Sequence, residues 1–181
     1  LADGSFVNKA APSFAKDSIS EDVAAEFFDA DGDGDMDLYV GSGGYEYAEN
    51  DPALQDRLYL NDGKGNFSKK TNALPPMLTS TGCVKAADID GDGDMDLFVG
   101  GRVVPGRYPV TTESYVRLND GKGNFTNATP TIAPSLKNIG MVTDALWMDI
   151  NKDGKNDLIV VGEWMPVKVF INEEGKLADA S

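Results

Sequence analysis

The sequence predicts an all-β fold in which four antiparallel strands make one blade, with about three blades of a larger β-propeller. An acidic stretch recurs three times, beginning at residues 29, 88 and 149. Each copy is followed by a second recurring pattern of strand, glycine-rich turn and strand. A fixed period of roughly 60 residues is typical of solenoids, propellers and arrays, and four strand-like segments in each period favour the propeller blade.

The acidic stretch has the spacing of a calcium loop. It reads DADGDGDMDLYVG from residue 29, DIDGDGDMDLFVG from residue 88 and DINKDGKNDLIVVG from residue 149. Calcium takes several oxygen ligands from alternating residues of a tight loop, and a glycine at position six permits the sharp turn.

Positions one, three, five and nine of each loop would contribute side-chain oxygens, and position seven its backbone carbonyl. A lysine at position seven of the third loop suits a residue from which only the carbonyl is needed. We therefore expect about three calcium ions. Their candidate ligands are Asp29, Asp31, Asp33, Asp35, Asp37; Asp88, Asp90, Asp92, Asp94, Asp96; and Asp149, Asn151, Asp153, Lys155, Asp157.

Two other readings of these loops are possible. An EF-hand needs a glutamate at position twelve and a helix on each side, whereas position twelve is Val40, Val99 and Val160. The flanking segments are rich in β-branched and aromatic residues, which favours strands. Solvated acidic turns are the second alternative, because Asp-Gly is ordinary hairpin chemistry. Three copies with one ligand spacing favour calcium, which we expect to hold the outer hairpin of each blade.

The glycine-rich turns lie in three hairpins, at 58–67, 116–125 and 169–177. Together with the acidic hairpins they divide the chain into expected blades at 21–72, 82–129 and 142–181. Residues 1–20 would then hold the last strand of a preceding blade and a linker, because Asp3 to Phe6 looks like the end of an earlier glycine turn. Since the sequence begins at Leu1 inside this motif, we expect an excised or mature fragment.

The connections between the second and third strands differ most between the units, at 42–56, 101–114 and 162–166. Long loops on a rigid scaffold are common places for recognition. Their aromatic and charged residues suit a sugar or a peptide, but they also suit packing between blades, and the sequence leaves both open. These residues are Tyr45, Glu46, Tyr47, Glu49, Arg102, Arg107, Tyr108, Glu163 and Trp164.

Composition excludes several classes of function. The formal charge of the 181 residues is −14, from 30 acidic and 16 basic side chains, which argues against a nucleic-acid partner. The longest apolar runs have strand length, so we expect no membrane-spanning segment. The absence of histidine removes Ser-His-Asp and Cys-His nucleophiles and histidine-ligated zinc. Cys83 is the only cysteine, so no intrachain disulfide can form.

Both recurring patterns, in this order, resemble FG-GAP/VCBS repeats, which build the calcium-binding β-propeller of integrin α subunits and of many bacterial surface proteins. The residues of the glycine-rich turns and the segment 103–109 look more like those of the bacterial surface proteins than those of the integrins. The resemblance implies a calcium role for the residues at positions one, three, five and nine of the three loops, which are aspartates apart from Asn151. Such propellers usually have about seven blades, so this chain would be part of a larger propeller, or copies would associate to close a ring.

The resemblance implies a module of a secreted or cell-surface protein that binds an extracellular protein or glycan, as in adhesion. Calcium sites of extracellular modules fill at millimolar concentrations, which favours an extracellular, cell-surface or periplasmic location. The alternative function is an accessory or catalytic part of a carbohydrate-active enzyme, such as a calcium-dependent lyase or hydrolase. Catalysis by these residues is the less favoured reading, and the partner's identity stays open because function depends on the site rather than on the fold.

Overall fold

A computed structural model describes residues 4–5 and 12–181. The strand expected within residues 1–20 lies largely outside the described residues. The part that is described contains a one-turn helix, α1 (Pro12–Ala15), and no strand before Glu21. No helix in the described part of the chain has the length and apolar character needed to cross a membrane.

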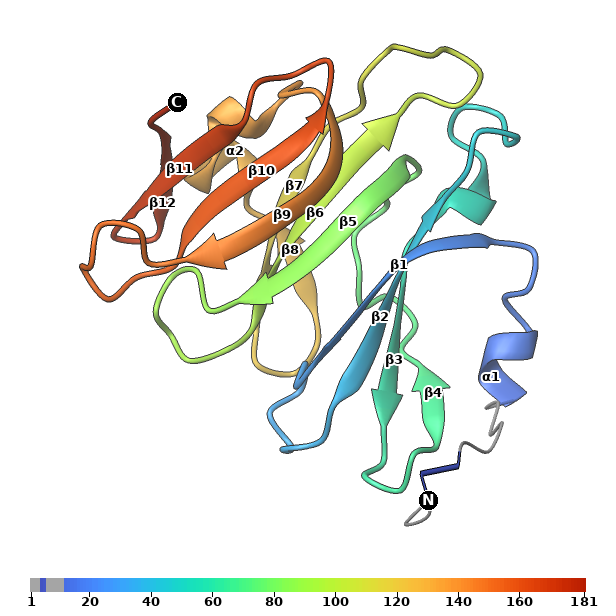
Figure 1. Ribbon diagram of the computed structural model, residues 1–181. Helices are drawn as coiled ribbons and strands as arrows, with labels where there is room; N and C mark the ends of the chain where they lie inside the picture. The colour runs from blue at the N-terminus through green and yellow to red at the C-terminus, as the bar shows by residue number, and fades with distance from the viewer. Residues whose placement is uncertain (1–3, 6–11) are drawn as a thin grey trace.

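The fold is all-β, as predicted, with three four-stranded antiparallel sheets that we call blades 1, 2 and 3 (Figure 1). In each blade the strands lie in sequence order. Blade 1 contains β1 (Glu21–Phe28), β2 (Asp37–Gly43), β3 (Arg57–Asn61) and β4 (Phe67–Lys69). Blade 2 contains β5 (Ser80–Ala87), β6 (Asp96–Val103), β7 (Tyr115–Asn119) and β8 (Phe125–Asn127). Blade 3 contains β9 (Met141–Met148), β10 (Asp157–Glu163), β11 (Lys168–Glu173) and β12 (Lys176–Asp179).

The blades contact one another mainly through their first strands. β5 lies beside β1 and also beside β9, so the three sheets fan out from this row of first strands without closing into a ring (Figure 1). The acidic loops join the first and second strands of each blade. They therefore belong to the inner hairpins, and the expectation that they lie in the outer hairpins is wrong, because the blades pack through the strand that precedes each loop.

The hydrophobic core consists of two clusters between neighbouring blades. Blade 2 contributes side chains from both of its faces, since successive residues of a strand point to opposite sides of the sheet. Between blades 1 and 2 the cluster includes Phe28, Tyr39, Leu58, Val84, Leu97, Val99 and Phe125. Between blades 2 and 3 it includes Ile89, Phe98, Val116, Val142, Leu158, Phe170 and Leu177.

The connections contain short helices that the sequence analysis did not predict. η1 (Pro52–Leu54) lies in the connection from β2 to β3. α2 (Thr129–Ile132) and η2 (Pro134–Leu136) link blade 2 to blade 3. η1 and η2 begin at a proline, whose fixed φ angle suits a first helical position, and α2 has a proline as its second residue, but each has at most four residues. Elements this short give no periodic apolar pattern.

A buried polar network lies between blades 1 and 2, around the carboxylate of Asp56. It accepts hydrogen bonds from the Tyr39 hydroxyl (2.7 Å), the Ser42 backbone amide (2.6 Å) and the Thr81 hydroxyl (3.0 Å). Burial is the main reason why the pKa of Asp56 rises from its ordinary value to about 7. This network was not expected, because its members come from separate strands and loops.

Candidate metal centres

The first acidic loop is a tight turn that Asp29 organises. Its carboxylate accepts hydrogen bonds from the backbone amides of Gly32 (2.8 Å) and Gly34 (3.0 Å). Both glycines have positive φ angles, +76° and +89°, which residues other than glycine rarely adopt. The glycines at positions four and six therefore allow the chain to curl around the Asp29 side chain.

Asp37, at position nine, closes this loop from the first residue of β2. It is fully buried, and its two carboxylate oxygens accept from the backbone amides of Ala30 (2.9 Å) and Asn61 (2.8 Å). These bonds fix the carboxylate between the loop and the third strand. Burial is the first cause of its raised pKa, because desolvation disfavours the charged form.

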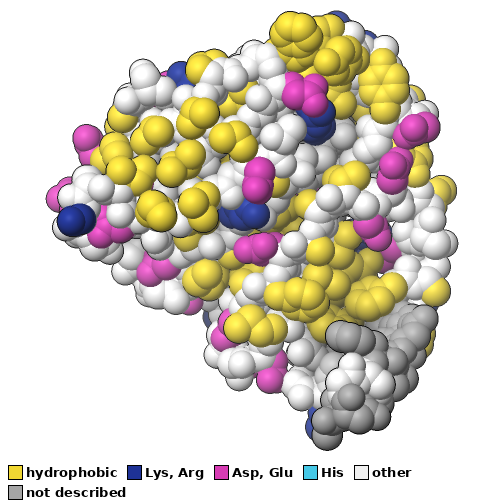
Figure 2. Space-filling view, viewed as in Figure 1, with side chains coloured by type: hydrophobic (Ala, Val, Ile, Leu, Met, Phe, Trp, Pro, Cys, Tyr) yellow, Lys and Arg dark blue, Asp and Glu magenta, His cyan; other side chains and the backbone are white. Residues whose placement is uncertain are grey.

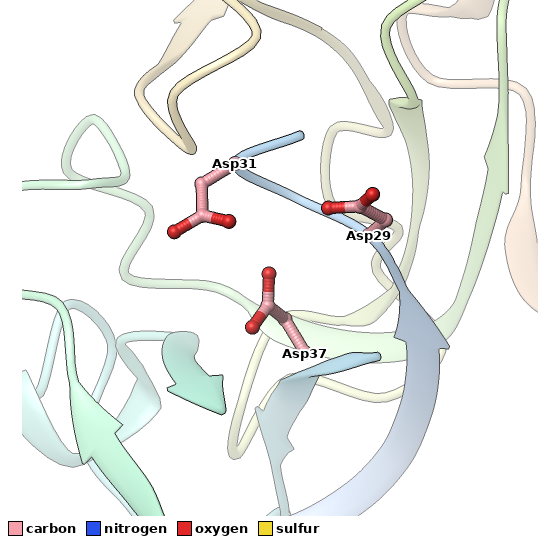
Figure 3. Close-up of side chains that lie close together, drawn as sticks. All are labelled: Asp29, Asp31 and Asp37. Atoms are coloured by element: carbon pink, nitrogen blue, oxygen red, sulfur yellow. The ribbon is translucent and has the colours of Figure 1, made fainter. Parts of the chain in front are cut away.

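The loop brings three carboxylates together, as Figure 3 shows for Asp29, Asp31 and Asp37. One oxygen of each lies within 4.8 Å of the others. Oδ1 of Asp31 is shielded from solvent and has no hydrogen-bond partner among the described residues. The pKa of Asp31 is raised, first by desolvation and then by the neighbouring charge of Asp33. An unpaired buried carboxylate oxygen beside two more carboxylates fits a bound cation, which supplies the missing partner.

The second loop repeats this geometry. Asp88 accepts from the amides of Gly91 (2.7 Å) and Gly93 (3.1 Å), and oxygens of Asp88, Asp90 and Asp96 lie within 4.8 Å of one another. Asp96 is buried, which raises its pKa to about 6. Its oxygens accept from the amides of Ile89 (3.0 Å) and Asn119 (2.9 Å), as those of Asp37 do from the equivalent residues in blade 1.

The third loop keeps the turn but carries less charge. Asp149 accepts from the amides of Lys152 (2.7 Å) and Gly154 (2.9 Å), and buried Asp157 accepts from those of Ile150 and Asn172. Position three is the neutral Asn151, whose side-chain amide donates to Asp153 (3.0 Å). Backbone donation from Lys155 is the first cause of the lowered pKa of Asp153. No group of three acidic side chains gathers here in the described structure.

Positions five and seven have distinct surroundings. Asp33 and Asp92 lie outside the two carboxylate groups, and each accepts from the backbone amide two residues later, at 2.9 Å. The side chains of Asp35 and Asp94 extend toward the glycine-rich turn of their own blade. A Cβ atom at Gly63 would lie 2.4 Å from the Asp35 carboxylate, and one at Gly121 would lie 2.5 Å from that of Asp94. Each turn glycine therefore leaves room for an aspartate.

An asparagine of the glycine-rich turn links the first and the second acidic loop to the blade that follows. Asn119 in blade 2 donates to the carbonyl of Ala30 in the first loop (2.9 Å), and Asn172 in blade 3 donates to that of Ile89 in the second (2.9 Å). Sequence reasoning missed this role. Its only signal was an asparagine at or next to the end of the third strand in every repeat.

At the other end of the strands, the three variable connections contact one another. Arg102 pairs with Glu163 (2.6 Å), and the indole of Trp164 donates to the Tyr108 hydroxyl (2.9 Å). Arg107, in the connection of blade 2, also forms an ion pair at 3.5 Å with Glu49, in the connection of blade 1. Beside them is a hollow of about 400 Å³, lined in part by Tyr45, Glu46, Arg102 and Tyr108. These contacts bring together, on one surface, loop residues that are far apart in the sequence.

Residues 43–99 match the model of a family described as FG-GAP-like repeat. The match begins at the end of β2, crosses the first glycine-rich turn and ends inside β6, so it includes the whole second acidic loop. No curated protein matches the chain.

Proposed function

We propose that this FG-GAP-like repeat protein is a calcium-binding module of β-propeller type, which presents its variable loops to an extracellular partner. The observation that carries the calcium proposal is the buried oxygen of Asp31, which lies beside Asp29 and Asp37 and has no hydrogen-bond partner in the described part of the chain. All three are carboxylates, and oxygen donors gathered on one loop suit a hard divalent cation such as calcium.

The proposed ligands are the side chains at positions one, three, five and nine and the carbonyl at position seven of each loop. Asp37 and Asp96 are already fixed by backbone amides, so they need little reordering on binding. Bound calcium would neutralise the carboxylates that otherwise repel one another. If free calcium exceeds the dissociation constant a hundredfold, each site adds about 2.7 kcal/mol to the free energy of unfolding.

We propose three sites of unequal strength. The third loop has Asn151 in place of an aspartate and Lys155 at position seven, so it presents fewer negative charges than the other two. The affinity of a calcium loop depends on the number of charged ligands and on its rigidity. The third site is therefore expected to be the weakest.

The experiment is calcium titration by calorimetry, together with thermal unfolding in millimolar calcium and after chelation. The test variants are Asp31→Asn and Asp90→Asn, which leave the loop's backbone contacts in place while removing one carboxylate. The matched control is Asp35→Asn, which removes a charge from the same loop but changes a side chain that extends toward Gly63. We expect each test variant to lose one strong site and the control to keep it. Equal melting temperatures with and without calcium would refute the proposal.

The proposed partner surface consists of the variable loops, and the proposed location is extracellular, on the cell surface or periplasmic. Trp164 is 77% exposed, and Tyr45 and Tyr108 are also exposed. Aromatic faces near charged hydrogen-bonding groups suit the apolar face and hydroxyls of a sugar, or a peptide. Titration of the chain with oligosaccharides, followed by tryptophan fluorescence, tests this surface, with Trp164→Ala as the variant. Cleavage of the sugar during the titration would favour the enzymatic alternative.

A further inference from the structure

We propose that the loop surface binds an oligosaccharide of amino sugars whose amines are free and positively charged. One sugar residue would lie in the hollow between blades 1 and 2, and the following residues would lie over Tyr108 and Trp164. This assignment rests on the proposed function, because it names the chemical class of ligand for the same variable loops.

Each variable connection contributes one exposed aromatic side chain to a single row. Tyr45 follows β2, Tyr108 follows β6 and Trp164 follows β10. The backbone amide of Tyr108 donates to the Tyr45 hydroxyl (3.5 Å), and the Trp164 indole donates to the Tyr108 hydroxyl (2.9 Å). Figure 2 shows hydrophobic side chains at the upper edge of the molecule, where Figure 1 places the connection from β6 to β7, with acidic and basic side chains beside them. Three aromatic side chains from consecutive blades suit an extended ligand built of similar units.

Trp164 is the member of this row that the stability of the fold does not explain. It is mostly exposed, so it adds little to the core, and its φ angle of +58° lies in the left-handed region that large residues rarely adopt. The equivalent position in blade 1 is Gly44, for which a positive φ angle is unstrained. A strained backbone that presents a large exposed ring favours a role in binding.

The hollow of about 400 Å³ lies between the beginning of β1 and the beginning of β5. Its wall includes Tyr45 and Tyr108 but not Trp164, so the aromatic row begins in the hollow and continues outside it. Residues of two adjacent blades form this wall. A hollow of this size accommodates one sugar residue, with the rest of the chain of sugars on the open surface.

Two carboxylates in the wall of the hollow converge on one point. A Cβ atom at Gly44 would lie 2.3 Å from Oε2 of Glu21 and 3.3 Å from Oε2 of Glu46, so the glycine leaves room for both. The charge of Glu46 is the first cause of the raised pKa of Glu21. Glu46 accepts from the Tyr45 backbone amide (3.0 Å), which is the first cause of its own lowered pKa. A positively charged group placed between the two carboxylates would relieve their repulsion.

The described residues leave this negative charge uncompensated. Arg102 is the only basic side chain in the wall of the hollow, and it is already paired with Glu163 at 2.6 Å. Neither Glu21 nor Glu46 forms an ion pair with a described residue. The hollow therefore attracts a cationic ligand and repels an acidic sugar.

An amino sugar with a free amine matches both the aromatic row and the carboxylates. Its ring offers an apolar face to the aromatic side chains, and its ammonium group forms charge-assisted hydrogen bonds with Glu21 and Glu46. N-acetylation would keep the ring but remove the charge. A basic peptide would satisfy the carboxylates, but it offers no repeating ring to aromatic side chains on three consecutive blades.

The experiment is isothermal titration calorimetry of the chain in calcium buffer, at a pH at which the sugar amine is protonated. The probes are glucosamine, its trisaccharide, the same trisaccharide after N-acetylation, the glucose trisaccharide of the same linkage, and a lysine tripeptide. Glu46→Gln removes one charge from the hollow but keeps an acceptor for the Tyr45 amide, and Trp164→Ala removes the ring outside it. The matched control is Glu173→Gln, which removes the same charge from an exposed glutamate at the opposite end of the strands. All three positions are exposed, so the variants should fold, which circular dichroism checks.

We expect the glucosamine trisaccharide to bind at least about tenfold more tightly than its acetylated or glucose counterpart, because these lack the charge-assisted hydrogen bonds. Glu46→Gln should weaken the binding of glucosamine and of its trisaccharide about tenfold. Trp164→Ala should weaken the binding of the trisaccharide alone, and Glu173→Gln should weaken neither.

Three results would each overturn the assignment. Equal binding of the glucose trisaccharide would remove the role of the amine while leaving a sugar-binding surface in place. Tighter binding of the lysine tripeptide would show that the ligand is a peptide. Unchanged binding by Glu46→Gln, or no binding of any probe, would show that the hollow is not the site. Calcium titration of the same samples shows separately whether the metal sites are present.

Discussion

Replacing the turn asparagine by alanine should lower the free energy of unfolding more in blade 2 than in blade 1. The reason is that Asn119 in blade 2 also donates a hydrogen bond to the acidic loop of the preceding blade. The Asn119 side chain makes four hydrogen bonds at 2.9 to 3.1 Å. It donates to the carbonyls of Ala30 and Met95, and it accepts from the backbone amides of Asp120 and Gly123. At a net value of about 1 kcal/mol each, Asn119→Ala should lower the free energy of unfolding by roughly 4 kcal/mol.

Asn61→Ala is the matched control, because Asn61 occupies the same position in blade 1. Its side chain makes two of these bonds, to Met36 and from Gly65, both at 3.1 Å, so the expected loss is about 2 kcal/mol. The difference of roughly 2 kcal/mol corresponds to a gap of about 4–8 °C in melting temperature for a domain of this size. The gap comes from two bonds that have no counterpart at Asn61, one across blades to the Ala30 carbonyl and one within blade 2 from the Asp120 amide.

The assay is urea unfolding and thermal unfolding of both variants at micromolar concentration in calcium buffer. Low concentration keeps association between copies from contributing to the measured stability. Equal losses for Asn119→Ala and Asn61→Ala would refute the reasoning, because they would show that the bond to Ala30 adds nothing beyond the contacts inside one blade.

Three further predictions concern the interior. Burial raises the pKa of Asp56 to about 7, so the folded state keeps this proton while the unfolded chain loses it near pH 4. The stability of the native protein relative to Asp56→Asn should therefore be greatest below pH 4 and fall as the pH rises to about 7, by on the order of 4 kcal/mol; a pH-independent difference in urea unfolding would contradict this. Gly82→Ala would place a Cβ atom 2.2 Å from the Val142 carbonyl oxygen, so it should cost about 1–3 kcal/mol by forcing β5 and β9 apart, and a change within about 0.5 kcal/mol would show that the strands yield. Burial raises the pKa of the Cys83 thiol to about 12, so a thiol reagent should modify the native protein far more slowly than the urea-unfolded chain, and equal rates would disagree.

The sequence predicted the hairpins well because their signals are local. Alternating apolar residues on each side of an Asp-Gly loop specify two strands and the turn between them, and three copies of the pattern specify three sheets. The gathering of Asp29, Asp31 and Asp37 follows from the same local spacing. The positions of Asp33 and Asp92 were harder to predict, because each carboxylate also accepts from a backbone amide two residues away.

Contacts between blades could not be read from the sequence in the same way. Asn119 and Ala30 are 89 residues apart, and nothing in either segment indicates that a side-chain amide of one meets a carbonyl of the other. The Asp56 network has the same difficulty, because Thr81 reaches that carboxylate from a different blade. The position of the acidic loops in the inner hairpins likewise depends on which strands face each other, which a repeat pattern leaves undetermined.

The bond between Asn172 and the Ile89 carbonyl also bears on how such a chain can change in length during evolution. Donor and acceptor occupy fixed places in neighbouring repeats, so an in-frame duplication of one period of about 60 residues would reproduce both. The new copy would find an acceptor in the repeat before it and would offer one to the repeat after it. Deletion of one period would rejoin the remaining donor and acceptor in the same way. An array built on this bond can gain or lose whole repeats without needing a compensating mutation at the junction.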